Sequence, residues 1–331
     1  MQPDLLSTPF PQPQDHKFTF IDLFAGVGGF RMALQNLHGR CAFSSEWNKH
    51  AQRTYALNYG EHPDGDITQD ETKAKIPEKF DILCGGFPCQ AFSIAGHRKG
   101  FQETRGTLFF DVAEIARKHR PKAVFLENVK NLISHDEGNT FQVICNTLEE
   151  LGYTVSYKVL NSMTHANVPQ NRERIFIVAL DPKQVPNYQD FEFPEEIPLT
   201  RGIQDILEKG RVDQKYYYAP GHRYYAKMAE GVTSKDTVYQ WRRVYVRENK
   251  SSVCPTLTAN MGSGGHNVPL ILDDYGIRKL TPKECFAFQG YPVHEMRFPK
   301  KMGNCALYMQ AGNSVTMPLI QRIGEQILKL F

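Results

Sequence analysis

One cysteine of this chain stands where a reactive thiol would be placed. Cys89 follows a short apolar run, Ile82–Cys84, and the turn Gly85-Gly86-Phe87-Pro88. Pro88 fixes its own backbone angle and donates no N–H, so it aims the next side chain instead of continuing a core strand. Structural cysteines usually lie within apolar runs, as Cys84 does, whereas Cys89 precedes a polar, glycine-containing stretch. We therefore interpret Cys89 as a nucleophile, with a packing role as the alternative.

A carboxyl group is expected at the end of another strand. Glu127 directly follows the apolar run at residues 123–126 and precedes Asn128. A buried carboxylate that stays charged and unpaired costs several kcal/mol. Glu127 is therefore expected either to have a partner or to have a raised pKa and take part in acid–base chemistry.

Two guanidinium groups lie where a third predicted strand, at residues 174–180, begins. Arg172 and Arg174 are two residues apart, so in a strand they would share one face. A pair of arginines at the mouth of an α/β crevice suits recognition of an anion or a carbonyl. The alternative is that both side chains lie on a solvated edge.

The chain also carries a turn that suits a nucleotide-like ligand. Ala25-Gly26-Val27-Gly28-Gly29 lies between a predicted strand and a predicted helix, where a ligand can approach the backbone closely. Glu46 follows Gly26 by about 20 residues, the spacing at which a carboxylate holds ribose hydroxyls. Asp66 is expected at the end of a third strand, where it could accept from an adenine amino group. A helix cap is its alternative role.

NAD and S-adenosylmethionine both fit these features, and two details favour the second. The glycines follow the pattern GxGG and not GxGxxG, because Arg31 occupies the last position. Phe24 stands at the end of the predicted strand, where its ring could stack on a purine or face a sulfonium.

A thiol, a carboxyl and a guanidinium around a methyl-donor site suit methylation of cytosine at carbon 5. The cytosine ring cannot attack a methyl group at carbon 5 unaided. Addition of a thiolate to carbon 6 makes carbon 5 nucleophilic, and a carboxyl at ring nitrogen 3 and the exocyclic amine lowers the barrier. An arginine on the ring oxygen would fix the orientation of the base.

The elements that must position these groups are predicted from alternating apolar runs and amphipathic stretches. This alternation, from residue 18 to about 180, predicts an α/β domain with a parallel sheet. The expected strands are residues 18–24, 41–45, 80–84, 123–126, 153–160 and 174–180, and the expected helices include 30–37, 141–148 and 318–328. Residues from about 185 to 280 are richer in Pro, Tyr and Gly and predict a second, irregular domain.

Composition limits the class of protein. The 331 residues have a net charge of +3, which permits a basic face without establishing one, and no apolar run reaches the length of a membrane span. The seven cysteines are widely spaced without a CxxC pair, which disfavours a disulfide framework or a metal site and favours reduced thiols in the cytoplasm. The first 17 residues lack the apolar core of a signal peptide and are expected to be a disordered tail.

Taken in order, six blocks of the chain resemble the bacterial DNA (cytosine-5) methyltransferases of restriction–modification systems. They are Asp22-Leu23-Phe24-Ala25-Gly26-Val27-Gly28-Gly29, Gly86-Phe87-Pro88-Cys89-Gln90, Glu127-Asn128-Val129, Gln170-Asn171-Arg172-Glu173-Arg174, Arg278-Lys279-Leu280-Thr281-Pro282-Lys283-Glu284-Cys285 and Gly312-Asn313-Ser314-Val315. The match excludes the tail and much of residues 185–240. It covers nearly all of the remaining chain. It implies a Rossmann-like methyltransferase fold with a mixed, mainly parallel sheet and a smaller target-recognition domain.

The resemblance also implies roles for individual residues. Cys89 would attack the base, Glu127 would hold it, and Arg174 would contact it with support from Arg172. The cofactor positions would be Phe24, Ala25, Gly26, Gly28, Gly29, Glu46, Trp47, Asp66, Ile67, Pro88, Asn313 and Val315. A loop at about 89–108 would close over the flipped base.

Contacts to double-stranded DNA are expected from that loop and from the smaller domain. Residues 239–247 interleave arginines with aromatics and are read as one strand that suits nucleic acid, with a solvated edge as the alternative. The predicted DNA-binding residues are Ser93, Arg98, Arg105, Arg242, Arg243, Arg247, Thr256 and Thr258. The protein is expected to act as a monomer, with no membrane association and no obligate protein partner.

The expected domains are a catalytic domain at 18–189, a target-recognition domain at 190–280, a hinge at 281–303 and a segment at 304–331 that returns to the catalytic domain.

Three other functions are alternatives to the methyltransferase. An RNA cytosine methyltransferase would share the chemistry, but the Cys-Phe-Thr signature of the relatives that methylate tRNA is absent from the sequence. A nicotinamide-dependent oxidoreductase lacks support from the glycine pattern. A DNA-binding protein without catalysis is disfavoured by the intact Cys89, Glu127 and Arg174.

Overall fold

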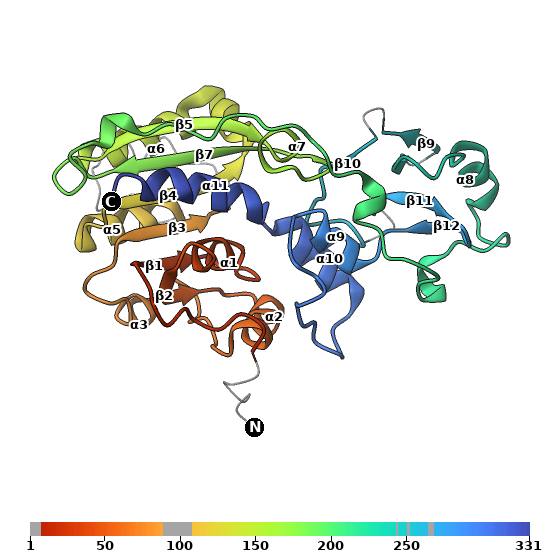
Figure 1. Cartoon of the computed structure of the whole chain (residues 1–331), viewed down its shortest axis with the longest axis horizontal. Helices are drawn as coiled ribbons and strands as arrows, with labels where there is room; N and C mark the ends of the chain where they lie inside the picture. The colour runs from red at the N-terminus through yellow and green to blue at the C-terminus, as the bar shows by residue number, and fades with distance from the viewer. Residues whose placement is uncertain (1–7, 89–107, 243, 250–251, 264–267) are drawn as a thin grey trace. The chain divides into compact units, whose positions relative to one another are not determined.

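The computed structural model describes residues 8–88, 108–242, 244–249, 252–263 and 268–331. The chain forms two compact units (Figure 1). The large unit comprises Met1–Leu160, Glu173–Glu195 and Met317–Phe331, and the small unit comprises Asn161–Arg172 and Glu196–Thr316. The chain therefore passes from one unit to the other four times.

A six-stranded sheet forms the centre of the large unit. Its strands are β1 (Phe18–Leu23), β2 (Gly39–Ser45), β3 (Ile82–Gly86), β4 (Ala123–Val129), β5 (Thr154–Asn161) and β7 (Glu173–Leu180). They are arranged in the order β2-β1-β3-β4-β7-β5. β1 pairs in parallel with β2 and β3, β3 pairs in parallel with β4, and β7 runs antiparallel to β4. The predicted mixed, mainly parallel sheet is confirmed.

Helices cover both faces of this sheet, as alternating side chains of the buried strands require. Val124 of β4 belongs to the core shared with α5 (Leu108–His119) and α6 (Asn139–Glu150). Phe125 points to the other face, where its ring contacts Phe30 of α1 (Gly29–Gln35) at 5.1 Å between centroids. α11 (Met317–Leu328) packs on α1, and Gly324 of α11 allows this approach because a Cβ there would lie 3.0 Å from Leu34.

The tail predicted to be disordered is ordered from residue 8 onward, so that prediction is wrong for residues 8–17. The side-chain amide of Gln12 donates to the carbonyl of Cys41 at 2.8 Å and accepts from the N–H of Cys41 at 3.0 Å. It thus makes the two hydrogen bonds that a neighbouring strand would make to this residue of β2. The Phe10 N–H also donates to Asn58, and Gln35 donates to Pro11. Glutamines interleaved with prolines, as at residues 9–14, gave no pattern from which this pairing could be recognised.

The remaining elements of the large unit connect the strands. They are α2 (Lys49–Tyr59), α3 (Asp70–Lys73) and the 3₁₀ segments η2 (Lys130–Gly138) and η3 (Tyr188–Asp190). The strand expected to end at Asp66 is absent from the described residues there. Instead a single bridge joins Asp64 to Ser45, and the chain then turns.

The small unit contains two sheets and short helices. β6 (Gln170–Asn171) pairs in parallel with β10 (Cys254–Pro255), and a four-stranded sheet has the order β12-β11-β8-β9. The other elements are η4 (Ile203–Asp205), η5 (Gln214–Tyr216), α7 (Ser162–Ala166), α8 (Tyr225–Gly231), β8 (Tyr239–Arg242), β9 (Tyr245–Glu248), β11 (Leu270–Asp273), β12 (Gly276–Lys279), α9 (Pro282–Ala287) and α10 (Asn304–Asn313). Residues 239–247, read as one strand, form the hairpin of β8 and β9.

The compact units are a different division from the functional domains expected at 18–189, 190–280, 281–303 and 304–331, which remain predictions. Asn161–Arg172 belongs to the small unit although it lies within the expected catalytic domain. Only Met317–Phe331 of the last expected segment belongs to the large unit. None of the helices in the described part of the chain is long and apolar enough to cross a membrane.

Candidate active site

The turn after β1 has an unusual backbone. Phe24 adopts a left-handed conformation with φ 57°, and Gly26 and Gly28 follow with φ 57° and 85°. A left-handed residue other than glycine is strained, and such strain persists where the surrounding structure imposes it, often at ligand sites. Gly28 is required for a second reason, because a Cβ there would lie 2.4 Å from the ring of Tyr59.

Glu46 is fixed directly beside this turn. Its Oε2 accepts from the N–H of Gly26 at 2.8 Å, and its Oε1 accepts from the N–H of Asn48 at 2.7 Å. Burial raises the pKa of Glu46, although these backbone N–H groups oppose that rise. A carboxylate offers about four acceptor positions, so Glu46 retains acceptor capacity for a ligand hydroxyl.

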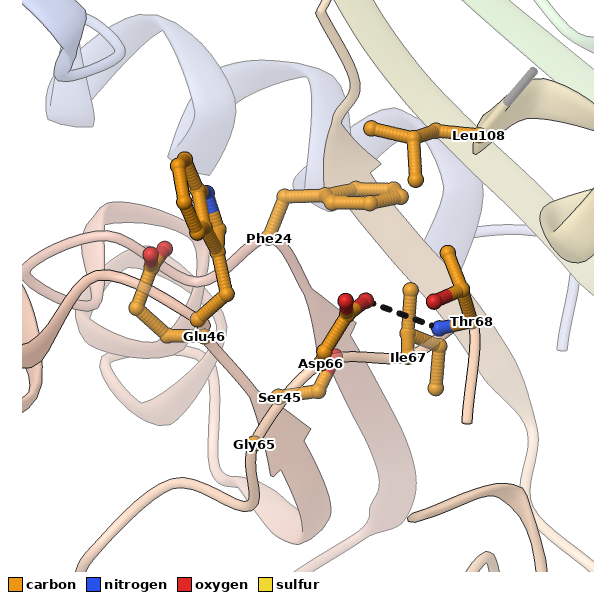
Figure 2. Close-up of a pocket in the computed structure, with 9 residues that line it drawn as sticks. Phe24, Ser45, Glu46, Gly65, Asp66, Ile67, Thr68 and Leu108 are labelled. Atoms are coloured by element: carbon orange, nitrogen blue, oxygen red, sulfur yellow. Dashed lines mark hydrogen bonds between the residues drawn. The ribbon is translucent and has the colours of Figure 1, made fainter. Parts of the chain in front are cut away.

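A pocket brings together five of the predicted cofactor residues. It is lined by Phe24, Ser45, Glu46, Trp47, Gly65, Asp66, Ile67, Thr68 and Leu108 (Figure 2). The Oδ1 atom of Asp66 accepts from the N–H of Thr68 at 3.0 Å, so the carboxylate stabilises a turn and does not cap a helix. Trp47 is 73% exposed, which leaves its ring available to a ligand.

Four lining residues were missed by the sequence analysis. Ser45, Gly65 and Thr68 are neighbours of predicted residues, so a wider window around Glu46 and Asp66 could have included them. Leu108 begins α5 and lies far from the cofactor motifs in the sequence, so no local signal could have found it.

The lining of this pocket fits an adenosine-containing methyl donor. Phe24 and Trp47 offer aromatic faces, Ile67 and Leu108 offer apolar contact, and Glu46 and Asp66 offer carboxylate acceptors. Aromatic and apolar side chains suit a purine ring, and carboxylates suit ribose hydroxyls and an exocyclic amine. The aromatic faces also suit a sulfonium.

The predicted carboxyl and guanidinium meet at the ends of β4 and β7. The Nε of Arg174 lies 3.1 Å from the Oε1 of Glu127, and both side chains are largely buried. The antiparallel register explains this meeting, because Arg174 pairs with Val129, two residues beyond Glu127. Glu127 therefore has the charged partner that its burial demands.

Asn128 connects this pair to the segment that leads into Cys89. Its side-chain amide donates to the carbonyl of Phe87 at 2.8 Å, and its Oδ1 accepts from the N–H of Val129. Gly86 at the end of β3 pairs with Glu127 of β4. The chain thus leaves β3 beside Glu127 only three residues before Cys89. Asn128 belongs to the motif Glu127-Asn128-Val129, but nothing in the sequence predicted this role for it.

Arg172 and Arg174 were expected to lie on one strand, and that expectation is wrong because β7 begins at Glu173. A break between β6 and β7 separates the two arginines, and they belong to different compact units. The guanidinium of Arg172 is 2% exposed and donates to the carbonyl groups of Leu257, Gly312 and Ser314. These carbonyls satisfy donors that would otherwise be buried without partners, and all three belong to the small unit.

The remaining predicted residues divide into three groups. Cys89, Ser93, Arg98, Arg105 and Arg243 lie outside the described residues. Asn313 and Val315 belong to the small unit. Ala25 lies in the turn after β1, Gly29 begins α1, and Pro88 is exposed just beyond β3, but none of these three is among the pocket residues.

The predicted DNA contacts that are described lie in the small unit. Arg242 and Arg247 are exposed and both donate to the Oε1 of Gln240, at 3.1 and 2.6 Å. Gln240 and Arg247 are direct cross-strand partners, which places the three side chains on one face of the hairpin. Thr256 donates to the carbonyl of Asn171, and Thr258 donates to the side chain of Asn260.

Comparison with known proteins identifies the family. The model of the C-5 cytosine-specific DNA methylase family matches residues 18–329. The chain belongs to that family. As a member it is a DNA (cytosine-5) methyltransferase that acts on DNA and uses S-adenosylmethionine as methyl donor, which excludes the nicotinamide-dependent alternative.

Individual relatives agree with the family match. Type II methyltransferase M.Bsp6I of Bacillus sp. (strain RFL6) is 47% identical over 311 residues, which cover 93% of this chain and 97% of that protein. Type II methyltransferase M.HhaI of Haemophilus parahaemolyticus is 41% identical over 318 residues, which cover 93% of each chain. A crystal structure of S. pombe Dnmt2 methyltransferase has a TM-score of 0.69 at 17% identity and covers 94% of this chain and 98% of that one. At that identity the last likeness shows the fold alone.

Proposed function

We propose that this methyltransferase modifies one cytosine within a short, specific sequence of double-stranded DNA and protects that sequence from a cognate restriction enzyme. The ion pair of Glu127 with Arg174, beside the strand that leads to Cys89, is the observation that carries the proposal. The names of M.Bsp6I and M.HhaI as Type II methyltransferases support the role in a restriction–modification system.

In the proposed reaction the target base is flipped out of the duplex, at a cost of a few kcal/mol. The thiolate of Cys89 forms a bond to carbon 6, and Glu127 holds ring nitrogen 3 and the exocyclic amine while charge develops on the ring. Arg174 holds the ring oxygen and keeps Glu127 oriented. After carbon 5 is methylated, its hydrogen leaves as a proton, the bond to Cys89 breaks, and the ring double bond is restored.

The donor pocket has a separate task. S-adenosylmethionine, when bound, supplies an electrophilic methyl group on a sulfonium. Glu46 would hold the ribose, Asp66 the adenine amine, and Phe24 and Trp47 the apolar faces of the ligand. Because Glu46 also holds the Gly26 N–H, it would fix the glycine turn and the ligand together.

The expected partner is double-stranded DNA, bound by a monomer without an obligate protein partner. The basic face of the β8–β9 hairpin and the residues Thr256 and Thr258 support this proposal. We also propose a cytoplasmic location, which is supported by the free thiols of Cys41, Cys84, Cys145, Cys254, Cys285 and Cys305.

The test is to incubate the protein with tritiated S-adenosylmethionine and either duplex DNA or tRNA, and then to map any modified base. We expect label on cytosine at a recurring DNA sequence. Label confined to tRNA, or no label on either substrate, would contradict the proposal.

A second measurement tests Cys89. DNA that contains 5-fluorocytosine at the mapped position has no hydrogen to lose from carbon 5, so it should trap a stable covalent complex. We expect Cys89→Ala to abolish this complex and Cys305→Ala, a replacement of an exposed thiol, to leave its yield unchanged. An equal yield from Cys89→Ala would exclude Cys89 as the attacking group.

A further inference from the structure

The buried guanidinium of Arg172 joins two distant segments of the small unit. Its Nη1 donates to the carbonyl of Leu257 at 2.8 Å, and its Nη2 donates to the carbonyls of Ser314 and Gly312 at 2.8 and 3.2 Å. Leu257 follows β10, whereas Gly312 and Ser314 lie at the end of α10. Arg172 therefore holds main-chain carbonyl groups of both segments, the one after β10 and the one at the end of α10.

Gln170 holds the same residue through its other backbone group, the N–H of Leu257. Its Oε1 accepts from the N–H of Leu257 at 3.0 Å, and its Nε2 donates to the carbonyl of Phe288 at 2.6 Å. The N–H and the C=O of Leu257 are thus both held by buried side chains two residues apart. We call Gln170 and Arg172 the backbone clamp.

Close packing supports the clamp. A Cβ on Gly312 would lie 2.2 Å from the carbonyl carbon and oxygen of Thr258, so α10 and the segment after β10 touch through their backbones. Gly262 is similarly tight, because a Cβ there would lie 2.5 Å from the ring of Tyr308. The Tyr308 hydroxyl in turn donates to the carbonyl of Leu280. The segment at residues 257–262 therefore has little room to shift on α10.

The clamp also sets which way the neighbouring side chains face. Leu257 is 1% exposed, whereas Thr256 is partly exposed and Thr258 is exposed. Thr256 is further tied by its hydroxyl to the carbonyl of Asn171 at 2.7 Å. Gln170 holds the peptide unit between Thr256 and Leu257, and Arg172 holds the peptide unit between Leu257 and Thr258. A rotation of either unit would change the direction of the adjacent threonine, and the clamp opposes both rotations.

We propose that Arg172 is a positioning residue for target recognition and makes no contact with the target base. It sets the direction of Thr256 and Thr258 by holding the Leu257 carbonyl, and Gln170 completes this task through the Leu257 N–H. The inference rests on the proposed function, because it requires a protein that discriminates between DNA sequences. It assigns Arg172 a task different from that of Arg174, which pairs with Glu127.

The chemistry of the guanidinium explains why arginine suits this position. Its planar fork presents several donors in fixed directions, whereas a lysine ammonium is a single compact group on a flexible stem. A lysine at this position keeps the charge but cannot reach the carbonyls of Leu257, Gly312 and Ser314 in the same way. Arg172→Lys is therefore the variant that loosens the clamp and conserves charge.

The experiment compares sequence discrimination among variants. Plasmid DNA of known sequence is methylated by each protein, and bisulfite sequencing gives the rate at the preferred sequence and at sites that differ from it by one base pair. We expect Arg172→Lys and Gln170→Met each to reduce the ratio of these rates by about tenfold, the order of one base-pair contact. The value of kcat at the preferred sequence should change less than this ratio.

Two other arginines serve as comparisons. Arg278→Lys alters an equally buried guanidinium of the small unit that pairs with Glu284, so it should lower the melting temperature and leave the discrimination ratio unchanged. Arg174→Lys should lower kcat and also leave the ratio unchanged. If Gln170→Met folds and Arg172→Lys does not, Gln170→Met decides the outcome through the Leu257 N–H.

The outcomes separate the two levels of the proposal. A wild-type protein that methylates DNA cytosines without sequence preference would overturn the proposed function. Preserved discrimination in Arg172→Lys and Gln170→Met, alongside a sequence-specific wild type, would overturn the positioning role alone. A loss of kcat in Arg172→Lys equal to that in Arg174→Lys, with discrimination unchanged, would place Arg172 at the target base and would also overturn it.

Discussion

Asp22 is a fully buried carboxyl on the face of β1 that α1 covers. Its Oδ2 accepts from the N–H of Arg31 at 3.3 Å. Burial raises the pKa of Asp22 to about 8, and this effect outweighs the bond from Arg31 and the charge of its guanidinium. Between the ordinary aspartate pKa of about 4 and this value, the folded protein holds a proton that the unfolded chain releases. The contribution of Asp22 to stability therefore falls as the pH rises from about 4 to 8.

We predict that Asp22→Asn removes this part of the pH dependence. The free energy of unfolding of the wild type should fall relative to the variant by up to about 1.4 kcal/mol per pH unit within that window. Urea unfolding of both proteins at pH 5, 6, 7 and 8 measures the difference. Curves that stay parallel across this range would show that Asp22 is ionised in the folded protein.

Single residues also show what the sequence could predict about the site. Glu127 was expected to need a partner because a carboxylate follows a buried strand, and Arg174 provides that partner. Arg172 could not be placed in the same way. Its partners are carbonyl groups, which every residue has, so nothing in the sequence distinguishes Leu257, Gly312 and Ser314 as the acceptors.

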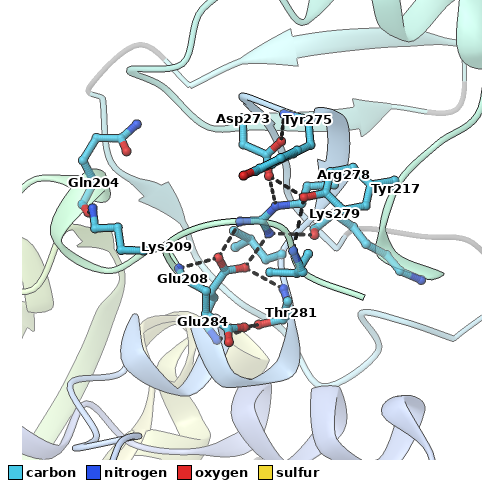
Figure 3. Close-up of polar contacts among 12 residues, drawn as sticks. Gln204, Glu208, Lys209, Tyr217, Asp273, Tyr275, Arg278, Lys279, Thr281 and Glu284 are labelled. Atoms are coloured by element: carbon cyan, nitrogen blue, oxygen red, sulfur yellow. Dashed lines mark hydrogen bonds and ion pairs between the residues drawn. The ribbon is translucent and has the colours of Figure 1, made fainter. Parts of the chain in front are cut away.

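Among the elements, β12 and α9 are joined by a buried ion pair. Arg278 donates from Nη1 and Nη2 to the two carboxylate oxygens of Glu284 at 2.8 and 2.7 Å (Figure 3). Glu284 also accepts from the N–H of Thr281, and the Thr281 hydroxyl accepts from the N–H of Glu284, which completes a capping box at the start of α9. Asp273 of β11 accepts from the Nε of Arg278. One carboxylate therefore serves both as a helix cap and as the counter-ion of a neighbouring strand.

We predict that Glu284→Gln lowers the free energy of unfolding by about 3 kcal/mol, because it leaves the buried Arg278 with less compensating charge. The matched control is Asp274→Asn, which removes an exposed partner of Lys235 in the same unit and should leave the denaturation midpoint unchanged. Urea unfolding followed by circular dichroism measures both variants. Equal midpoints for Glu284→Gln and the wild type would refute this account of the ion pair.

Element boundaries followed from the sequence where the strands are buried. The largely apolar runs at 18–24, 123–126 and 174–180 lie on β1, β4 and β7, because strands covered on both faces are mostly apolar. The hairpin of β8 and β9 was read as one strand, since its turn lacks the Asn-Gly or Asp-Gly signal that marks short hairpins. The pairing of β6 with β10 joins residues about 85 positions apart and has no local signature.

At the level of the whole molecule, a net charge of +3 is too small to provide affinity for DNA, so the affinity must come from local basic surfaces. Arg242 and Arg247 form such a surface with Gln240 on the hairpin. If each arginine neutralises one phosphate, Arg242→Gln and Arg247→Gln should each reduce the slope of log K against log salt concentration by about 1. Fluorescence anisotropy with duplex DNA at several salt concentrations measures the slope. Lys235→Gln is the control, because Lys235 pairs with Asp274.

An unchanged slope in both arginine variants would exclude the hairpin as a phosphate-binding surface. A change in sequence preference without a change in slope would instead indicate contacts to bases.

The overall fold was accessible from the sequence because its ordered motifs mark the strand ends of a known architecture. The division of the chain was not. The segment Asn161–Arg172 leaves the large unit between two strands of its sheet and joins the small unit. Such a crossing depends on contacts between residues far apart in the chain, such as Gln170 with Phe288, which composition and periodicity do not report.

The backbone clamp has a consequence for how enzymes of this design can diversify. Gln170 and Arg172 hold the N–H and C=O of Leu257, atoms that remain whatever side chains flank them. Thr256, Thr258 and Asn260 can therefore be exchanged by point mutation while the support beneath them persists. An enzyme can in this way acquire a new DNA recognition sequence through successive point mutations. The backbone that supports the mutated residues stays the same at each step.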